Sequence, residues 1–223
     1  MREIVLDTET TGFRQNDGDR IVEIGCIELV NHVATGNNYH QYINPERSMP
    51  EEAFNVHGLS EEFLSDFPVM ADVMEAFLEF IGDETPLVIH NAEFDMRFIN
   101  AELGHLGQEP LPMSRSIDTV RMAREKFPGA PASLDALCRR FEIDNTSRTL
   151  HGALLDAELL AEVYLELIGG RQPDFELAED KASETVAAQE TQRRDPRPHA
   201  ASAAEQSAHT AFLEKIKDPL WTA

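Results

Sequence analysis

Residues 4–12 read Ile4-Val5-Leu6-Asp7-Thr8-Glu9-Thr10-Thr11-Gly12. The stretch opens with a short apolar run typical of a buried central strand, and it ends in a polar turn. Side chains two positions apart on a strand point to the same face, so Asp7 and Glu9 project together from the strand's end. Open α/β sheets bind their ligands at this edge. The stretch therefore predicts an α/β fold with an acidic site at the end of its first strand.

A second acidic position follows another short apolar run, at residues 87–89. Asn91 is a candidate N-cap for the next helix, and Asp95 shares a helical face with Phe98 and Ile99. A carboxylate on an apolar face needs a partner. Taken alone, this segment fits a salt bridge to a nearby arginine.

A third motif, His151 to Asp156, opens the most strongly periodic apolar helix of the chain. Asp156 precedes Leu160 by four positions and Val163 by seven, so its side chain points along the buried face. Five residues of ideal helix turn through about 500°. His151 therefore reaches the same site only from the first helical turn or from the loop before it.

Four carboxylates that gather at one site need cations between them. At an effective dielectric near 20, two like charges about 4 Å apart repel by roughly 4 kcal/mol. Oxygen ligands favour Mg²⁺ or Mn²⁺ over zinc or copper, and two such ions about 4 Å apart promote displacement at phosphorus. A neutral His151 can accept the proton of the attacking water. The predicted reaction is phosphodiester hydrolysis.

The three motifs, in their order and spacing, resemble those of the DEDDh family of 3′→5′ exonucleases. More closely, residues 1–170 are similar to the proofreading exonuclease subunits of bacterial replicative DNA polymerases, including the segments 35–40, 56–58 and 133–138. The resemblance implies a ribonuclease-H-like fold and His151 as general base. It also implies four residues that bind metal and take part in catalysis: Asp7, Glu9, Asp95 and Asp156.

The segment 50–58 resembles the nucleotide pocket of the family. The resemblance implies that Glu52 and His57 contact the terminal nucleotide, beside the metal-binding Asp7, Glu9 and Asp156. Phe54 and Phe94 are candidates for base stacking, and core packing is an equal alternative for both.

The charge of the chain is unusual for a protein that acts on nucleic acid. The net charge is −22, and residues 1–170 hold 12 Lys and Arg against 31 Asp and Glu. Because affinity for DNA comes chiefly from neutralising phosphates, the chain should hold a DNA 3′ end weakly on its own. We therefore expect partner proteins to present the DNA.

Two segments after residue 170 are candidate docking sites. Residues 172–177 place Gln172, Phe175 and Leu177 in a pattern similar to the peptide that docks on the sliding clamp, although an ordinary linker start fits equally well. Residues 171–208 have few large apolar groups and are expected to form a disordered linker. Residues 209–223 regain apolar side chains, which predicts a docking segment: Phe212, Ile216, Leu220 and Trp221. By resemblance, its partner is the alpha subunit of DNA polymerase III, and a small accessory subunit is a further candidate partner.

Periodicity predicts a mixed five-stranded sheet flanked by helices, with strands near 3–8, 20–30, 38–43, 86–90 and 115–118. The first three strands are expected to form an antiparallel meander through a turn at 35–37. Helices are expected near 70–81, 93–106, 118–126, 133–140 and 152–168.

Composition narrows the setting. Cys26 and Cys138 lie in apolar surroundings, which fits buried thiols in a reducing cytoplasm, and there is no signal-peptide pattern or bilayer-length apolar stretch. Two other functions stay open. A DEDDh exoribonuclease would use the same site residues but would not need the docking tail, and a structural bridge between clamp and polymerase would make the nuclease site secondary.

Overall fold

The computed structural model describes residues 1–146, 148, 150–170 and 201–217. These residues belong to two separate units, Met1–Leu177 and Ala178–Ala223. None of the described helices is long and apolar enough to cross a membrane.

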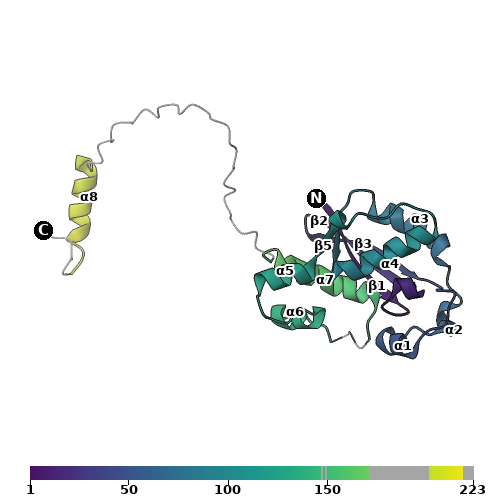
Figure 1. The fold of residues 1–223 in the computed structure, drawn as a ribbon. Coiled ribbons are helices and arrows are strands. Elements are labelled where there is room, and N and C mark those ends of the chain that lie inside the picture. Colours follow the sequence, from purple (N-terminus) through teal and green to yellow (C-terminus); the bar gives the residue numbers. More distant parts are fainter. Residues whose placement is uncertain (147, 149, 171–200, 218–223) are drawn as a thin grey trace. The chain divides into compact units, whose positions relative to one another are not determined.

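The first unit is built on a single sheet of five strands in the order β3-β2-β1-β4-β5 (Figure 1). Its strands are β1 (Arg2–Thr10), β2 (Ile21–Val30), β3 (Val33–Tyr42), β4 (Leu87–Ile89) and β5 (Ser116–Asp118). β1, β2 and β3 pair antiparallel, whereas β4 pairs parallel with both β1 and β5. The predicted mixed five-stranded sheet is confirmed.

The turn between β2 and β3 lies at Asn31 and His32, so the expectation of a turn at 35–37 was wrong. Both residues adopt the left-handed conformation, with φ of 51° and 64°, and Val30 pairs with Val33. This is the pattern of a two-residue type I′ hairpin turn. Residues 35–37 lie inside β3, where the register with β2 shifts and Gly36 has a φ of 87°. Gly36 therefore belongs to an irregularity within β3 and not to a turn at the end of the strand.

The five predicted helices are present, each within one residue of the expected bounds: α3 (Met70–Ile81), α4 (Ala92–His105), α5 (Thr119–Lys126), α6 (Leu134–Phe141) and α7 (Ala153–Leu167). The prediction missed four short elements: η1 (Gln15–Asp17), α1 (Glu51–His57), α2 (Glu61–Leu64) and η2 (Met113–Arg115). These elements are too short to show a helical period in the sequence.

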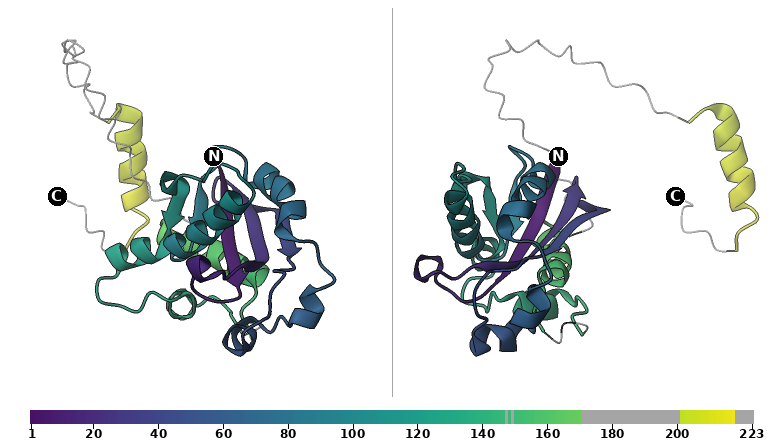
Figure 2. Two further views of the ribbon diagram at one scale, coloured as in Figure 1. Left: turned by 45° about the vertical axis from the view of Figure 1, so that its right-hand side comes forward. Right: turned by 90° about the vertical axis from the view of Figure 1, so that its right-hand side faces the viewer.

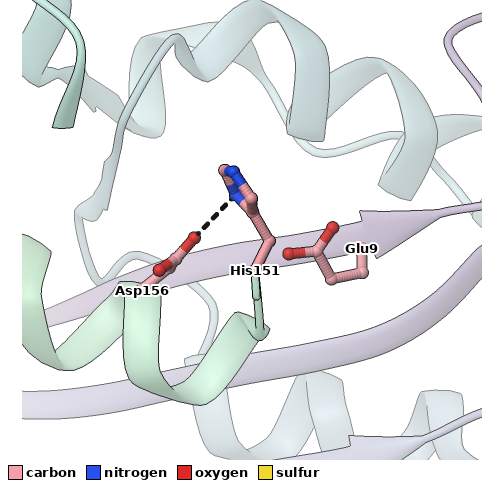
Figure 3. A group of neighbouring side chains, drawn as sticks. All are labelled: Glu9, His151 and Asp156. Carbon is pink, nitrogen blue, oxygen red and sulfur yellow. Dashed lines mark hydrogen bonds and ion pairs between the residues drawn. The ribbon is translucent and has the colours of Figure 1, made fainter. Parts of the chain in front are cut away.

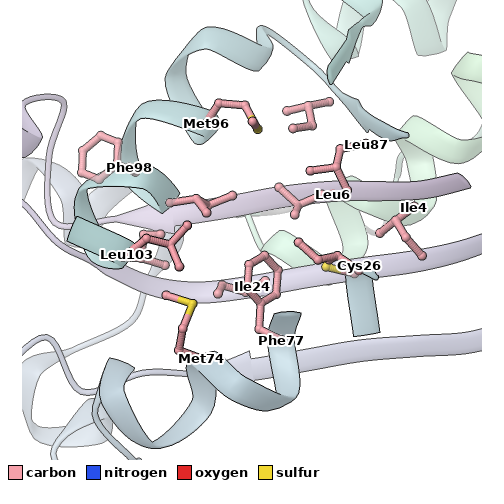
Figure 4. Packing of buried hydrophobic residues seen from close by; sticks show 14 of the residues in the cluster. Ile4, Leu6, Ile24, Cys26, Met74, Phe77, Leu87, Met96, Phe98 and Leu103 are labelled. Carbon is pink, nitrogen blue, oxygen red and sulfur yellow. The ribbon is translucent and has the colours of Figure 1, made fainter. Parts of the chain in front are cut away.

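Helices cover both faces of the sheet (Figure 2), and the sheet separates two hydrophobic clusters. Alternate residues of β1 point to opposite faces, so Leu6 packs with α3 and α4 whereas Val5 packs with α5, α6 and α7. Figure 4 shows the first cluster, in which Phe77 and Met96 meet the central strands. Cys26 and Cys138 are buried free thiols, one in each cluster.

The described part of the second unit contains one helix, α8 (Ala203–Leu213). It begins with a capping box in which Ser202 and Glu205 bond reciprocally. The predicted linker extended to residue 208, whereas residues 203–208 belong to this helix. The Ser-x-x-Glu pattern at 202–205 is the sequence signal of its start. Phe212 and Ile216 are exposed. Five predicted partner residues lie outside the described residues: Gln172, Phe175, Leu177, Leu220 and Trp221.

Candidate active site

A cavity of about 280 Å³ lies at the carboxyl end of β1. Its lining brings together four segments that are far apart in the sequence, and it contains all five predicted catalytic residues: Asp7, Glu9, Asp95, His151 and Asp156. Asp7 and Glu9 come from β1, Asp95 from α4 and Asp156 from the first turn of α7. The predicted convergence of these side chains is therefore present in the fold.

Asp95 is held by Thr8 rather than by an arginine. The backbone N–H and the hydroxyl of Thr8 both donate to Oδ1 of Asp95, at 3.1 and 2.7 Å. Thr8 points from β1 toward α4, opposite to its neighbours Asp7 and Glu9. Asn91 stands at the N-cap position of α4, but its side chain makes no capping hydrogen bond, so that part of the expectation was wrong.

The start of α7 is fixed against β2. The buried carboxylate of Glu23 accepts a hydrogen bond from the backbone N–H of Ala153, at 3.1 Å. Two residues along β2, a Cβ on Gly25 would overlap backbone atoms of Ala153 and Leu154. Only glycine allows this approach, which sets the position of the helix that carries Asp156.

His151 lies in the loop before α7, as its spacing from Asp156 required. Its backbone N–H donates to the carbonyl of Val56, at 3.1 Å. Its Nδ1 lies 3.2 Å from Oδ2 of Asp156, and Figure 3 shows this contact together with the nearby carboxylate of Glu9. Ligand atoms of Glu9, His151 and Asp156 all lie within 4.8 Å of one another, close enough to share one cation.

Arg148 is a member of the site that the motif analysis did not include. Its Nε and Nη2 donate to the two oxygens of Asp156, at 2.5 and 2.6 Å, and its Nη1 donates to Asp135 at 2.7 Å. Nη2 also lies 2.7 Å from Nδ1 of His151. This contact is shorter than the one between His151 and Asp156, so we assign Nδ1 as an acceptor from Arg148.

The electrostatics of the cavity favour bound cations. Burial, together with repulsion from Asp156, raises the pKa of Glu9 to about 8. Burial raises the pKa of Asp95 to about 7, and burial with repulsion from Asp95 raises the pKa of Asp7 well above its usual value. Asp156 differs: burial opposes its ionisation, but the hydrogen bonds and positive charge of Arg148 hold its pKa below the usual value. Clustered carboxylates with raised pKa values suit bound divalent cations.

A second cavity, of about 430 Å³, adjoins the first and shares Thr8, Glu9, Phe94 and His151 with it. Glu52 and His57 line it, where the resemblance placed them. Nδ1 of His57 accepts from the backbone N–H of Leu59, so Nε2 carries the proton, and this buried atom has no hydrogen-bond partner among the described residues. Phe94 lines this cavity, whereas Phe54 is exposed and does not.

Three residues that support the site were absent from the sequence-based prediction: Thr8, Glu23 and Arg148. Thr8 is hidden because it lies between two more conspicuous acids. Glu23 acts across 130 positions of sequence, which no local pattern reveals. Arg148 could have been predicted, because it precedes His151 by three positions and a cation so near the acidic motif is a candidate partner for Asp156.

The comparisons agree with the fold and the site. The exonuclease family model (RNase_T) matches residues 4–164. Exonuclease X in complex with 5′-overhanging duplex DNA is 27% identical, with a TM-score of 0.58, over 74% of this chain and 90% of that one. The nuclease domain of 3′hExo, a DEDDh family member bound to rAMP, shares the fold at 16% identity, with a TM-score of 0.64, over 75% and 91% of the two chains. Fold and site together define a metal-dependent 3′→5′ exonuclease.

Curated relatives narrow the class further. DNA polymerase III subunit epsilon of Rickettsia felis is 56% identical over 188 residues, covering 83% of this chain and 81% of the relative. The Escherichia coli protein of the same name is 51% identical over 179 residues, covering 76% and 72%. The chain belongs to the exonuclease family and, within it, to the DNA polymerase III epsilon subunits.

Proposed function

We propose that the chain proofreads DNA synthesis by hydrolysing the 3′-terminal nucleotide of a mismatched primer to a nucleoside monophosphate. The observation that carries this proposal is the convergence of the four carboxylates and His151 on one cavity beside a nucleotide-sized cavity. The family membership makes the activity that of a proofreading 3′→5′ exonuclease subunit.

The carboxylates of the site are assigned to two divalent cations, Mg²⁺ or Mn²⁺. Asp7, Glu9, Asp95 and Asp156 would hold them, since all four line the same cavity. When bound, the ions supply positive charge that activates a water molecule and offsets the charge on the scissile phosphate.

His151 is assigned as the general base. It is the one imidazole in contact with Asp156 among the described residues, and its ring is half-exposed, so water and substrate reach it. The proton of the attacking water passes to a ring nitrogen of the neutral imidazole.

The adjoining cavity is assigned to the terminal nucleotide. His57 offers an unpaired N–H donor at Nε2 for a sugar or phosphate oxygen, and Glu52 lies on the same wall. Because the two cavities share Glu9 and His151, a nucleotide bound here places its phosphate at the carboxylates.

Partners follow from the epsilon subunit family and from the charge. The partners are DNA and DNA polymerase III, and the setting is the bacterial cytoplasm. Residues 209–223 would dock on the alpha subunit. Residues 171–208 would form the linker between this segment and residues 1–170, and the linker would begin with the clamp-binding motif at 172–177. A small accessory subunit is a further partner for residues 1–170. A chain with net charge −22 gains from being tethered to the polymerase, because tethering raises its local concentration at the primer end.

The test is release of the 3′ nucleotide from a labelled mismatched primer in Mn²⁺. We expect Asp7→Ala to abolish release, while Asp72→Ala, which changes an exposed aspartate of α3, leaves it intact. Faster trimming of RNA than of DNA would favour the exoribonuclease alternative. Full activity of Asp7→Ala would overturn the metal assignment, whereas no release by the wild type would favour the structural-bridge alternative.

A further inference from the structure

Arg148 is a buried cation placed inside a site built for cations. Its side chain is 8% exposed, and four donor contacts account for its position: two to Asp156, one to Asp135 and one to His151. The forked guanidinium bonds both oxygens of Asp156, so each carboxylate oxygen already has a cationic protein donor.

The same two oxygens are those that Asp156 offers to a divalent ion. We propose that Arg148 is an internal counter-ion of the metal site, which competes with the divalent cations for Asp156 and thereby sets the affinity of the site. This inference rests on the proposed assignment of Asp156 as a metal ligand. It makes Arg148 a positioning residue, because it acts through Asp156 and His151.

Asp135 lowers the free-energy cost of moving Asp156 from Arg148 to a metal ion. A buried guanidinium that lost every partner would carry a large desolvation penalty. Nη1 of Arg148 is bonded to Asp135, whose side chain is 46% exposed and which also accepts from the amide of Asn145. Arg148 therefore keeps a carboxylate partner on α6 when Asp156 turns to a metal ion.

The contact with His151 has a second consequence. Nη2 of Arg148 occupies the lone pair of Nδ1 at 2.7 Å. Release of Asp156 from Arg148 moves this donor as well, so metal loading and freeing of the imidazole are coupled through one side chain. The coupling deepens the proposed reaction by linking the general base to occupancy of the metal site.

Mn²⁺ affinity measured by electron paramagnetic resonance of the free ion tests the inference without reference to activity. We expect Arg148→Gln to bind Mn²⁺ roughly tenfold more tightly, since one nearby positive charge is removed. Arg148→Lys keeps the charge but loses the fork, so its affinity should fall between those of wild type and Arg148→Gln.

Arg20→Gln is the matched control. Arg20 forms a similar forked pair with buried Glu102, at 2.8 and 2.7 Å, and it lines neither of the two cavities described above. Its loss should change stability but leave Mn²⁺ affinity within about twofold of wild type.

Unchanged or weaker Mn²⁺ binding by Arg148→Gln would overturn the inference. If metal affinity is unchanged and the KM for DNA rises, Arg148 is a phosphate ligand instead. If Arg148→Gln does not fold, Arg148→Lys decides by the same criterion. Asp156→Asn separates the two failures. Loss of Mn²⁺ binding in this variant, with no effect of Arg148→Gln, refutes the counter-ion alone, whereas wild-type binding by Asp156→Asn refutes the metal site itself.

Discussion

Glu23 on β2 caps the first turn of α7 by accepting a hydrogen bond from the backbone N–H of Ala153, at 3.1 Å. The helix has no side-chain cap of its own at Gly152, so a strand supplies it. The other oxygen of Glu23 lies 2.7 Å from Nε2 of His40, which holds the carboxylate in place. The position of Asp156 therefore depends on a residue that lines neither cavity, although Glu23 lies opposite Glu9 in the sheet and its charge contributes to the raised pKa of that carboxyl.

Replacing Glu23 with Ala should lower both stability and activity. Loss of the cap leaves a buried N–H unpaired and costs about 1–2 kcal/mol of unfolding free energy. We expect kcat to fall more than KM rises, because the change displaces the catalytic helix rather than the nucleotide pocket. Urea unfolding and steady-state kinetics measure the two effects. Glu23→Gln keeps an acceptor oxygen and should recover most of the loss, and equal damage by both variants would argue against capping.

Gly25 and Gly104 form a matched pair for an alanine test. A Cβ on Gly25 would overlap the backbone of α7, so Gly25→Ala should cost about 1–3 kcal/mol and reduce hydrolysis as α7 shifts. A Cβ on Gly104, inside α4, would meet no atom within 4 Å, and Gly104→Ala should stabilise the protein by roughly 0.5–1 kcal/mol. Thermal unfolding of both variants checks the pair. A tolerated Gly25→Ala would show that contact with α7 does not set the site.

The hydroxyl of Thr8 donates a hydrogen bond that holds the carboxylate of Asp95 in place, and Thr8→Val tests its importance. Valine has a similar shape but cannot donate, so Asp95 loses its 2.7 Å hydrogen bond. Loss of such outer-shell donors typically costs 10–100-fold in metal affinity or activity, and we expect about that range here. Mn²⁺ titration and hydrolysis assays measure it. Thr35→Val, which changes an exposed threonine of β3, serves as control, and equal effects of the two would count against the assignment.

The contribution of His57 to stability should be lost as the pH drops below about 6.5, whereas the raised pKa values of Glu9 and Asp95 favour the folded state over the same range. Burial lowers the pKa of His57 below its usual value of about 6.5. The unfolded chain then takes up a proton before the folded one does, so the stabilisation is complete above about pH 6.5 and is lost as the pH falls. His57→Gln should therefore become more stable relative to wild type as the pH is lowered from about 7.5 to about 5.5, approximate limits set by that reference value. His90, whose pKa burial also lowers, acts in the same direction as His57 and is retained in both proteins.

Urea midpoints at the two pH values measure this dependence. His209→Gln, which changes an exposed histidine of α8, should leave the wild-type pH dependence unchanged. An identical pH dependence in wild type and His57→Gln would show that His57 does not contribute.

The fold was largely predictable because its signals are local. Apolar runs at Ile4–Leu6 and Leu87–Ile89 are too short for helices, and α7 repeats its apolar residues with a clear helical period. The turn at Asn31 and His32 escaped prediction because Gly36, the stronger turn former, was used by a strand irregularity instead.

The acidic core of the site was predictable for a different reason. The sequence marks the strand end or helix start near which each carboxylate lies, and the topology brings these points to one edge of the sheet. The carboxylates are Asp7, Glu9, Asp95 and Asp156. Their supporting contacts were not predictable. Glu23 to Ala153 and Thr8 to Asp95 join elements 130 and 87 residues apart, and such pairings depend on tertiary packing alone.

Anomalous scattering from a crystal of the protein grown with Mn²⁺ and a nucleoside monophosphate tests the central assignment most directly. Two Mn²⁺ peaks should lie among Asp7, Glu9, Asp95 and Asp156, with the phosphate beside them and the nucleoside against His57. Peaks at other residues, or none at these four carboxylates in crystals that contain the nucleotide, would contradict the assignment.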